Sequence, residues 1–368
     1  MAMTFGRRTW LAGAATLAVQ PLGAQPLGAQ PLGVHSLGAQ SLGVPPAARP
    51  SDGEWSRFKA RFLAPDGRVV DTGNNNQSHS EGQGWGLLLA VHHDDRPAFD
   101  SMLRWTRSTL RRDGDLLHTW RWMPTAVPIQ DRNNATDGDL FIAASLVRGG
   151  ARWSDPSLTE EGIAVARDVL RLLVRRVDDM LVLLPGARGF EHRSHVVLNP
   201  SYYALPAIAT LAEALPDPAW LRVVTDGLRL LRGAQFGRWG LPPDWIAVSR
   251  LDGRVTPAQG WPARFAYDAV RIPLWLSWVG LGEEPCVVRP ATFWADEAHR
   301  YLPAWADLTT DATSPYPAGP GMAGVARLAA LRGNVPVRRG LTDARGDGRD
   351  YYDTALGLLA RMAQSESG

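Results

Sequence analysis

The sequence contains one cysteine, Cys286, and one lysine, Lys59, among its 368 residues. A single cysteine excludes an intrachain disulfide framework and a metal site built from several thiolates. The positive charge is therefore almost entirely arginine, and it nearly cancels the acidic charge, with 39 basic against 37 acidic residues. Because no basic run exceeds two residues, the sequence does not predict binding to nucleic acid.

Long apolar runs are also missing. Beyond the N-terminal segment no stretch reaches about 18 uncharged apolar residues, so we expect no stable membrane span. Residues 1–24 have the three parts of an export signal: Arg7 and Arg8, the short apolar core Trp10–Val19, and small residues at Leu22–Ala24. The arginine pair resembles a twin-arginine signal. We therefore expect a periplasmic or secreted protein.

A pentapeptide follows and overlaps the end of this signal. Gln-Pro-Leu-Gly-Ala occupies 20–24, and close variants repeat it through residue 44. Segments this rich in glycine, proline and small residues cannot bury a core and behave as flexible spacers. The sequence thus predicts a signal peptide (1–24), a linker (25–50) and a single folded domain (51–368).

The domain itself has a globular composition, with 45% hydrophobic and 21% charged residues in the whole chain. Apolar residues recur at the helical period, while strand-like stretches are few, at 180–184 and 245–248. Without regular strand–helix alternation, a doubly wound sheet or a TIM barrel is disfavoured. We predict an all-α fold of helical hairpins around an axis, with a cleft in the loops at one end. The expected helices are 54–62, 84–93, 98–111, 139–149, 157–177, 204–214, 218–231, 268–279, 290–300, 321–332 and 351–363.

The polar segment 71–86 precedes an apolar helix that we expect to be under way by Leu87. It contains Glu81, with Gly82 next to it, where a bulky ligand can approach the backbone closely. Trp85, four residues later, shares a helical face with Glu81 if the helix has begun. Two interpretations remain open: a catalytic carboxylate, or an acid that stabilises a helix start.

Two further stretches combine acids with a helix start. Asp137 and Asp139 are two residues apart before an apolar helix, an arrangement that suits either a metal ligand pair or a helix cap, although no histidine or third acid is nearby. Asp268 and Arg271 have the spacing at which side chains meet on one helical face, which would keep the carboxylate ionised. From the Asp268–Arg271 pair alone, a buried structural ion pair is the simpler interpretation.

Together these stretches resemble glycoside hydrolase family 8. Ser80–Gly86 (SEGQGWG) is similar to the family's segment with the proton donor, Ala135–Asp139 (ATDGD) to its signature aspartate segment, and Tyr267–Arg271 (YDAVR) to the segment with the base. Asn199–Tyr203 (NPSYY) and Pro243–Trp245 (PDW) resemble the short members that accompany bacterial cellulose synthesis. All five motifs occur in the family's order, over about 55–359.

The resemblance implies an (α/α)6 barrel that hydrolyses β-1,4-linked glucan with inversion at the anomeric carbon. It implies that Glu81 is the general acid and Asp268 the general base. Asp137 would bind the distorted sugar, and Tyr267 and Arg271 would support Asp268. No cofactor and no metal are expected.

Fifteen tryptophans are roughly three times ordinary usage, and flat indole faces suit sugar rings. Trp120 and Trp122 lie two residues apart in one short segment, and of the two we expect Trp120 to face the cleft. Tyr202 is a second candidate for contact with the glucan. The histidines show no metal-binding spacing, but His79 lies close enough to Glu81 in sequence to support it.

The expected partner is a β-1,4-glucan chain, and the cellulose synthase machinery is a further candidate partner of what we expect to be a monomer. Within the family, chitosanase and xylanase activities remain open alternatives. A chitosanase cleft would carry extra acids for the ammonium groups of its substrate. A non-catalytic glucan-binding component of an export complex is another alternative, although both catalytic acids are present. A helical-barrel polysaccharide lyase would need a Tyr/His or Lys pair instead.

Overall fold

The computed structural model describes residues 52–338, 348 and 350–367, and residues 50–368 form a compact unit. The predicted signal peptide and the whole predicted linker fall outside the described residues. Eleven α-helices and nine short strands lie within the part that is described. None of these helices is long and apolar enough to cross a membrane.

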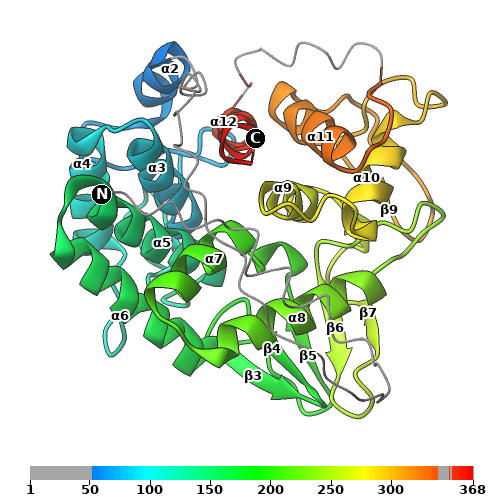
Figure 1. Ribbon diagram of the computed structural model, residues 1–368, viewed down its shortest axis with the longest axis horizontal. Coiled ribbons are helices and arrows are strands. Elements are labelled where there is room, and N and C mark those ends of the chain that lie inside the picture. Colours follow the sequence, from blue (N-terminus) through cyan, green and yellow to red (C-terminus); the bar gives the residue numbers. More distant parts are fainter. Residues whose placement is uncertain (1–51, 339–347, 349, 368) are drawn as a thin grey trace, which may run out of the picture. The chain divides into compact units, whose positions relative to one another are not determined.

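Six helices form a closed inner ring (Figure 1). Each packs against the next one along the chain, and the last returns to the first. The first of them is buried on all sides, as expected of a helix enclosed by neighbours. In chain order the inner helices are α3 (Ser80–His92), α5 (Thr136–Trp153), α7 (Leu205–Ala214), α9 (Arg271–Trp278), α11 (Pro320–Arg332) and α12 (Tyr351–Glu366).

Five described helices pack outside this ring. The apolar residues of the more amphipathic ones, such as α4 (Arg96–Thr109) and α8 (Pro218–Gly233), lie on one face, which is buried. From α2 to α11 outer and inner helices alternate along the chain, and α12 completes the six inner helices of an (α/α)6 barrel. This confirms the predicted fold class. The outer helices are α2 (Asp52–Phe62), α4 (Arg96–Thr109), α6 (Pro156–Leu173), α8 (Pro218–Gly233) and α10 (Pro285–Ala295).

The strands are short, antiparallel and confined to the connections. One of their pairings matters for the cleft: Ser78 pairs with Trp122 and His79 with Arg121, which brings the segment before α3 beside the segment around residue 120. The pairs are β1 (Ser78–His79) with β2 (Arg121–Trp122), β3 (Val174–Val177) with β4 (Met180–Leu183), β5 (His195–Leu198) with β6 (Ile246–Ser249) and β7 (Val255–Pro257), and β8 (Arg264–Phe265) with β9 (Ala306–Asp307).

All eleven expected helices exist, but some boundaries were wrong. The helix expected over 290–300 runs over Pro285–Ala295, because proline is favoured in the first turn and starts it earlier. The helix expected to reach 177 ends at Leu173, where the chain continues as a strand. Its first residue is Pro156, after the N-cap Asp155, one residue earlier than expected.

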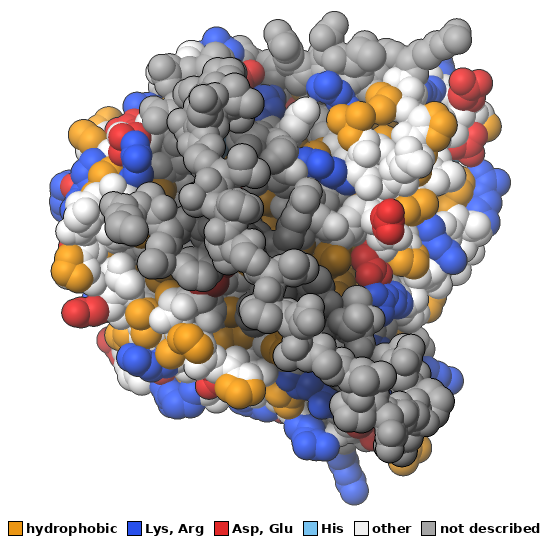
Figure 2. Space-filling model, viewed as in Figure 1, with side chains coloured by type: hydrophobic (Ala, Val, Ile, Leu, Met, Phe, Trp, Pro, Cys, Tyr) orange, Lys and Arg blue, Asp and Glu red, His pale blue; other side chains and the backbone are white. Residues whose placement is uncertain are grey.

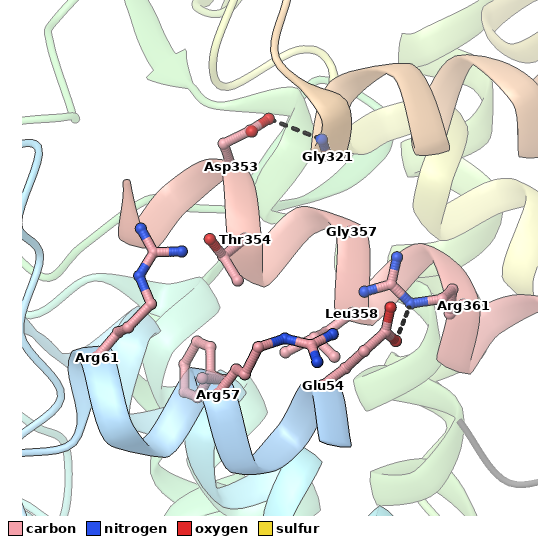
Figure 3. Close-up of a pocket in the computed structure, with 10 residues that line it drawn as sticks. Glu54, Arg57, Arg61, Gly321, Asp353, Thr354, Gly357, Leu358 and Arg361 are labelled. Carbon is pink, nitrogen blue, oxygen red and sulfur yellow. Dashed lines mark hydrogen bonds and ion pairs between the residues drawn. The ribbon is translucent and has the colours of Figure 1, made fainter. Parts of the chain in front are cut away.

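A small pocket lies between α2 and α12 (Figure 3). Glu54 forms an ion pair with Arg361 at 2.8 Å, and the Asp353 carboxylate accepts the backbone N–H of Gly321 at 2.8 Å. With a volume of about 20 Å³ the pocket has room for a water molecule but not for a sugar. We therefore interpret it as packing between two helices.

Candidate active site

A cleft of about 620 Å³ opens at one end of the barrel. The N-terminal ends of α3, α5, α9 and α12 meet here, and the positive ends of helix dipoles favour carboxylates nearby. Acidic and basic side chains are interspersed around the rim of the face shown in Figure 2. All seven residues singled out from the sequence line this cleft: Glu81, Trp120, Asp137, Tyr202, Tyr267, Asp268 and Arg271.

Glu81 lies in the first turn of α3, not in a loop before the helix as expected. The helix starts earlier because His79 caps it: its Nδ1 accepts the backbone N–H of Gly82 at 2.9 Å. The backbone N–H of Ser80 donates to the carbonyl of Trp120 at 3.0 Å. These contacts fix Glu81 and Trp120 relative to one another.

Asp137 lies on the same side of the cleft as Glu81 because α3 and α5 start very close together. A Cβ on Gly138 would lie only 2.7 Å from the backbone nitrogen of Glu81 and closer still to the Ser80 hydroxyl. Only glycine therefore permits this approach. Asp137 itself is buried, and one of its oxygens accepts the N–H of Gly138 at 2.8 Å.

Arg271, the first residue of α9, connects the three acids. Its Nη1 contacts Glu81 and lies 3.2 Å from Asp137, while its Nη2 contacts Asp268 and donates to the Ser201 hydroxyl at 2.9 Å. The Arg271 residue is only 3% exposed. One buried guanidinium thus serves three carboxylates, which leaves an excess of negative charge.

Asp268 lies in the turn just before α9, whereas the sequence predicted it on the helix. The side chain of Asp244 holds this turn: its Oδ1 accepts the backbone N–H of Ala266 at 3.0 Å and of Ala269 at 2.7 Å. The predicted contact of Asp268 with Arg271 is nevertheless made. The carboxylate of Asp268 is therefore positioned by a clamped turn.

Burial and mutual repulsion disfavour the charged forms in this cluster. Burial raises the pKa of Asp137 to about 7. The pKa of Asp268 is also raised, by burial and then by the neighbouring carboxylates Asp244 and Asp137. Burial raises the pKa of Asp244 to about 6 and lowers the pKa of Arg271. The expectation that Arg271 simply keeps Asp268 ionised is thus incomplete, because burial and the neighbouring carboxylates raise the pKa of Asp268 despite the contact with Arg271.

Asp139, two residues after Asp137, has a different environment. One oxygen accepts the backbone N–H of His118 at 2.8 Å and lies 3.0 Å from its Nδ1, and the other accepts from Asn134 at 2.9 Å. Asp139 therefore braces the 118–134 connection. The described residues contain no group of His, Cys, Asp and Glu that suits a metal ion.

The predicted aromatic contacts lie along the cleft. Trp120 is oriented by a hydrogen bond from its Nε1 to Asp131, at 3.0 Å. The Tyr267 residue is 47% exposed, and its hydroxyl lies 3.2 Å from that of Tyr316. The ring of Tyr202 lies 5.8 Å from the guanidinium of Arg271.

Other cleft residues were not assigned a role from the sequence. The lining includes Asp71, Asp350 and Tyr352, and the Tyr352 hydroxyl donates to the backbone carbonyl of Tyr267. Asp71 lies 3.4 Å from His79 Nε2, so His79 is tied to the cleft wall while it caps α3. Only the barrel closure places Asp350 and Tyr352 here, and no local pattern signals them.

Comparisons with known proteins agree with this geometry. The family model described as glycosyl hydrolases family 8 matches residues 36–366. A probable endoglucanase of Novacetimonas hansenii is 43% identical over 316 residues, covering 85% of this chain and 90% of the relative. An endoglucanase of Cellulomonas uda is 41% identical over 290 residues, covering 78% and 79%. The solved endo-β-1,4-glucanase from Acetobacter xylinum superposes with a TM-score of 0.79 at 42% identity, over 86% of this chain and 98% of the other. The chain belongs to glycoside hydrolase family 8.

Proposed function

We propose that the protein is an endo-acting β-1,4-glucanase that cuts cellulose-type chains. The observation that carries this proposal is the cluster of Glu81, Asp137 and Asp268 around Arg271 in an open cleft with aromatic side chains. Two carboxylates with separate roles are what hydrolysis of a glycosidic bond requires. The relatives above 40% identity are named endoglucanases, which favours a glucan substrate.

In this proposal Glu81 gives its proton to the glycosidic oxygen as the bond breaks. Arg271 can release Glu81 to the leaving oxygen because it keeps Asp137, Asp268 and Ser201 as partners. Asp137, at the start of α5, binds the sugar whose bond is cut. The aromatic side chains Trp120, Tyr202 and Tyr267 hold the neighbouring sugar units.

Asp268 acts as the general base on a water molecule that attacks the anomeric carbon from the opposite face. The product then has the inverted configuration, and the two carboxyl groups must leave room for that water. Asp268 has to be deprotonated to take the proton. Its raised pKa therefore predicts that activity falls as the pH is lowered through that pKa, at a higher pH than for an ordinary aspartate.

The decisive assay follows viscosity and reducing ends together on carboxymethyl cellulose, chitosan and xylan. An endo-acting glucanase lowers the viscosity of carboxymethyl cellulose long before many ends appear, and NMR of fresh product detects α-configured new ends. Faster release from chitosan or xylan would contradict the substrate assignment. β-Configured ends would contradict the inverting mechanism while leaving the substrate intact.

Chitosan is the second candidate substrate, because the cleft lining contains two additional acids, Asp71 and Asp350. Both already have partners in the protein: Asp71 lies near His79, and Asp350 accepts the N–H of Asp353 at 2.9 Å. Neither carboxylate is therefore free to hold an ammonium group alone, and cellulose remains the favoured substrate.

The place of action is proposed from residues 1–50 alone. The signal-like start and the repeat motivate an exported enzyme that acts on glucan outside the cytoplasm, in support of cellulose biosynthesis. Mass spectrometry of the mature protein from the periplasm tests export, and an intact Met1 start in the cytosol would contradict it. Cellulose yield and fibre form in a deletion strain test the biosynthetic role.

A further inference from the structure

Large aromatic side chains are rarely exposed in the part of the chain that the structure describes. Three are: Trp261, Tyr267 and Tyr316. Tyr267 lines the cleft, and Tyr316 is bonded to it through their hydroxyls. Trp261, at 42% exposed, is the largest of the three and has no role in the mechanism above. The other tryptophans of the described residues are more buried than Trp261. An exposed apolar side chain close to a cleft often marks a binding site.

Trp261 is held in one orientation by a stack of rings. Its ring lies parallel to that of Trp245, with centroids 4.0 Å apart and planes at 17°. Trp245 is also nearly parallel to Phe190, at 5.8 Å and 10°. The backbone helps, because the N–H of Ala258 donates to the carbonyl of Trp245 at 3.1 Å and the N–H of Trp261 to that of Ala258 at 3.4 Å. A ring fixed in this way loses little conformational entropy when a ligand stacks on it.

The stack starts at the catalytic cluster. Trp245 follows Asp244, which clamps the turn that carries Asp268, and it packs edge-on against Tyr202 with ring centroids 6.1 Å apart. The ring of Trp261 therefore lies within about 10 Å of that of Tyr202, which lines the cleft. The rings of Tyr202, Trp245 and Trp261 therefore form a continuous aromatic row that leads from the cleft to the protein surface.

We propose that Trp261 is an outer platform on which a sugar unit of a longer β-1,4-glucan chain stacks, beyond the subsites next to the carboxylates. The inference rests on the proposed glucanase function. A flat indole face suits the apolar face of a glucose ring, and Trp245 supports it from below. Binding at such a remote point strengthens the hold on long chains without taking part in bond cleavage.

The test measures kcat/KM for soluble cello-oligosaccharides of three to six units. In Trp261→Ala the ratio of kcat/KM for cellohexaose to kcat/KM for cellotriose is expected to fall roughly 3- to 10-fold. Trp261→Tyr, which keeps an aromatic face, should restore most of that ratio. Leu251→Ala is the matched control, since Leu251 is 89% exposed on the nearby β6–β7 hairpin and outside the stack. It should leave the ratio at the wild-type value.

A circular dichroism melt of each variant establishes that it is folded. An unchanged ratio in folded Trp261→Ala would overturn the platform, and so would an equal loss on short and long chains, which indicates a disturbed stack. The wild-type measurement decides the proposed function separately. If the wild type cuts none of the oligosaccharides, the glucanase function itself is wrong.

Discussion

The cleft and the small pocket between α2 and α12 both contain arginine and carboxylate side chains, but they differ in charge balance. In the pocket Glu54 pairs with Arg361 alone among the described residues, and Arg61 donates to the carbonyl of Gly348 at 3.0 Å. In the cleft Arg271 alone contacts three carboxylates, and no other lysine or arginine is among its described lining residues. The Glu54–Arg361 ion pair is matched one to one, whereas the cluster around Arg271 has three carboxylates for one guanidinium.

This difference in charge balance indicates a structural role for the pocket between α2 and α12 and a chemical role for the cleft. A matched and partly exposed ion pair contributes little to stability and changes little with pH. An unmatched buried cluster holds its charges at a cost and shifts pKa values toward the working pH, as the values for Asp137 and Asp244 indicate. Substitutions in the two regions should therefore have opposite effects on activity and on stability.

The largest effect is expected from the two catalytic carboxylates. Glu81→Gln and Asp268→Asn should each lower kcat on glucan by about 10²- to 10⁴-fold. Glu81→Gln should keep much of its activity on an aryl cellobioside with a very acidic leaving group, because such a group needs no proton. Asp268→Asn should be inactive on both substrates.

The matched control is Glu54→Gln in the α2–α12 pocket, the same chemical change at a distance from the cleft. Steady-state rates on carboxymethyl cellulose and on the aryl glycoside decide the comparison. An Asp268→Asn variant that keeps a kcat on glucan close to the wild-type value would contradict the assignment of the base.

Arg271→Lys should come next, with a loss of about 100-fold in kcat/KM. Lysine keeps the charge, but a single ammonium group lacks the planar fork with which arginine reaches Glu81, Asp137 and Asp268 together. Arg361→Lys in the pocket is the matched control and should retain activity. Equal rates for both variants would show that geometry at Arg271 is unimportant.

The sequence predicted the barrel well because the apolar residues of amphipathic helices recur at the helical period, which can be recognised locally. It predicted helix ends less well. These ends depend on N-cap residues such as His79 and Asp155, and neighbouring residues in the sequence could serve as caps equally well. Asp268 was placed on a helix because its spacing to Arg271 suits one. A turn clamped by Asp244 satisfies the same contact.

The cluster itself was predictable only in part. The Arg271–Asp268 contact is local, at three residues, but Arg271 also meets Asp137 across 134 residues of chain. Such contacts arise only when the ring of inner helices closes, and no spacing rule anticipates them. The same reason explains why Asp350 and Tyr352 were not assigned to the cleft.

A smaller effect is expected at Asp244, which acts on Asp268 through the turn and through its charge. Asp244→Asn keeps an oxygen that can accept the N–H groups of Ala266 and Ala269, but it removes a negative neighbour that raises the pKa of Asp268. The acidic limb of the kcat/KM–pH profile should therefore move to lower pH. A merely structural role for Asp244 predicts a uniform loss with an unmoved limb.

The smallest effects are on stability, and here the two regions should differ in sign. The folded-state pKa of Asp137, about 7, lies above its ordinary value of 3.8, so the folded protein binds this proton more tightly than the unfolded chain does. This group therefore favours folding at low pH and disfavours it as the pH rises toward and above 7. Asp137→Asn should raise Tm by about 2 °C or more at pH 8 and leave it nearly unchanged at pH 4. Glu54→Gln removes a matched pair and should lower Tm by about 2 °C or less. Differential scanning calorimetry at both pH values measures the contrast, and a Tm gain for Asp137→Asn that does not grow with pH would show that the excess charge in the cleft is not what costs stability.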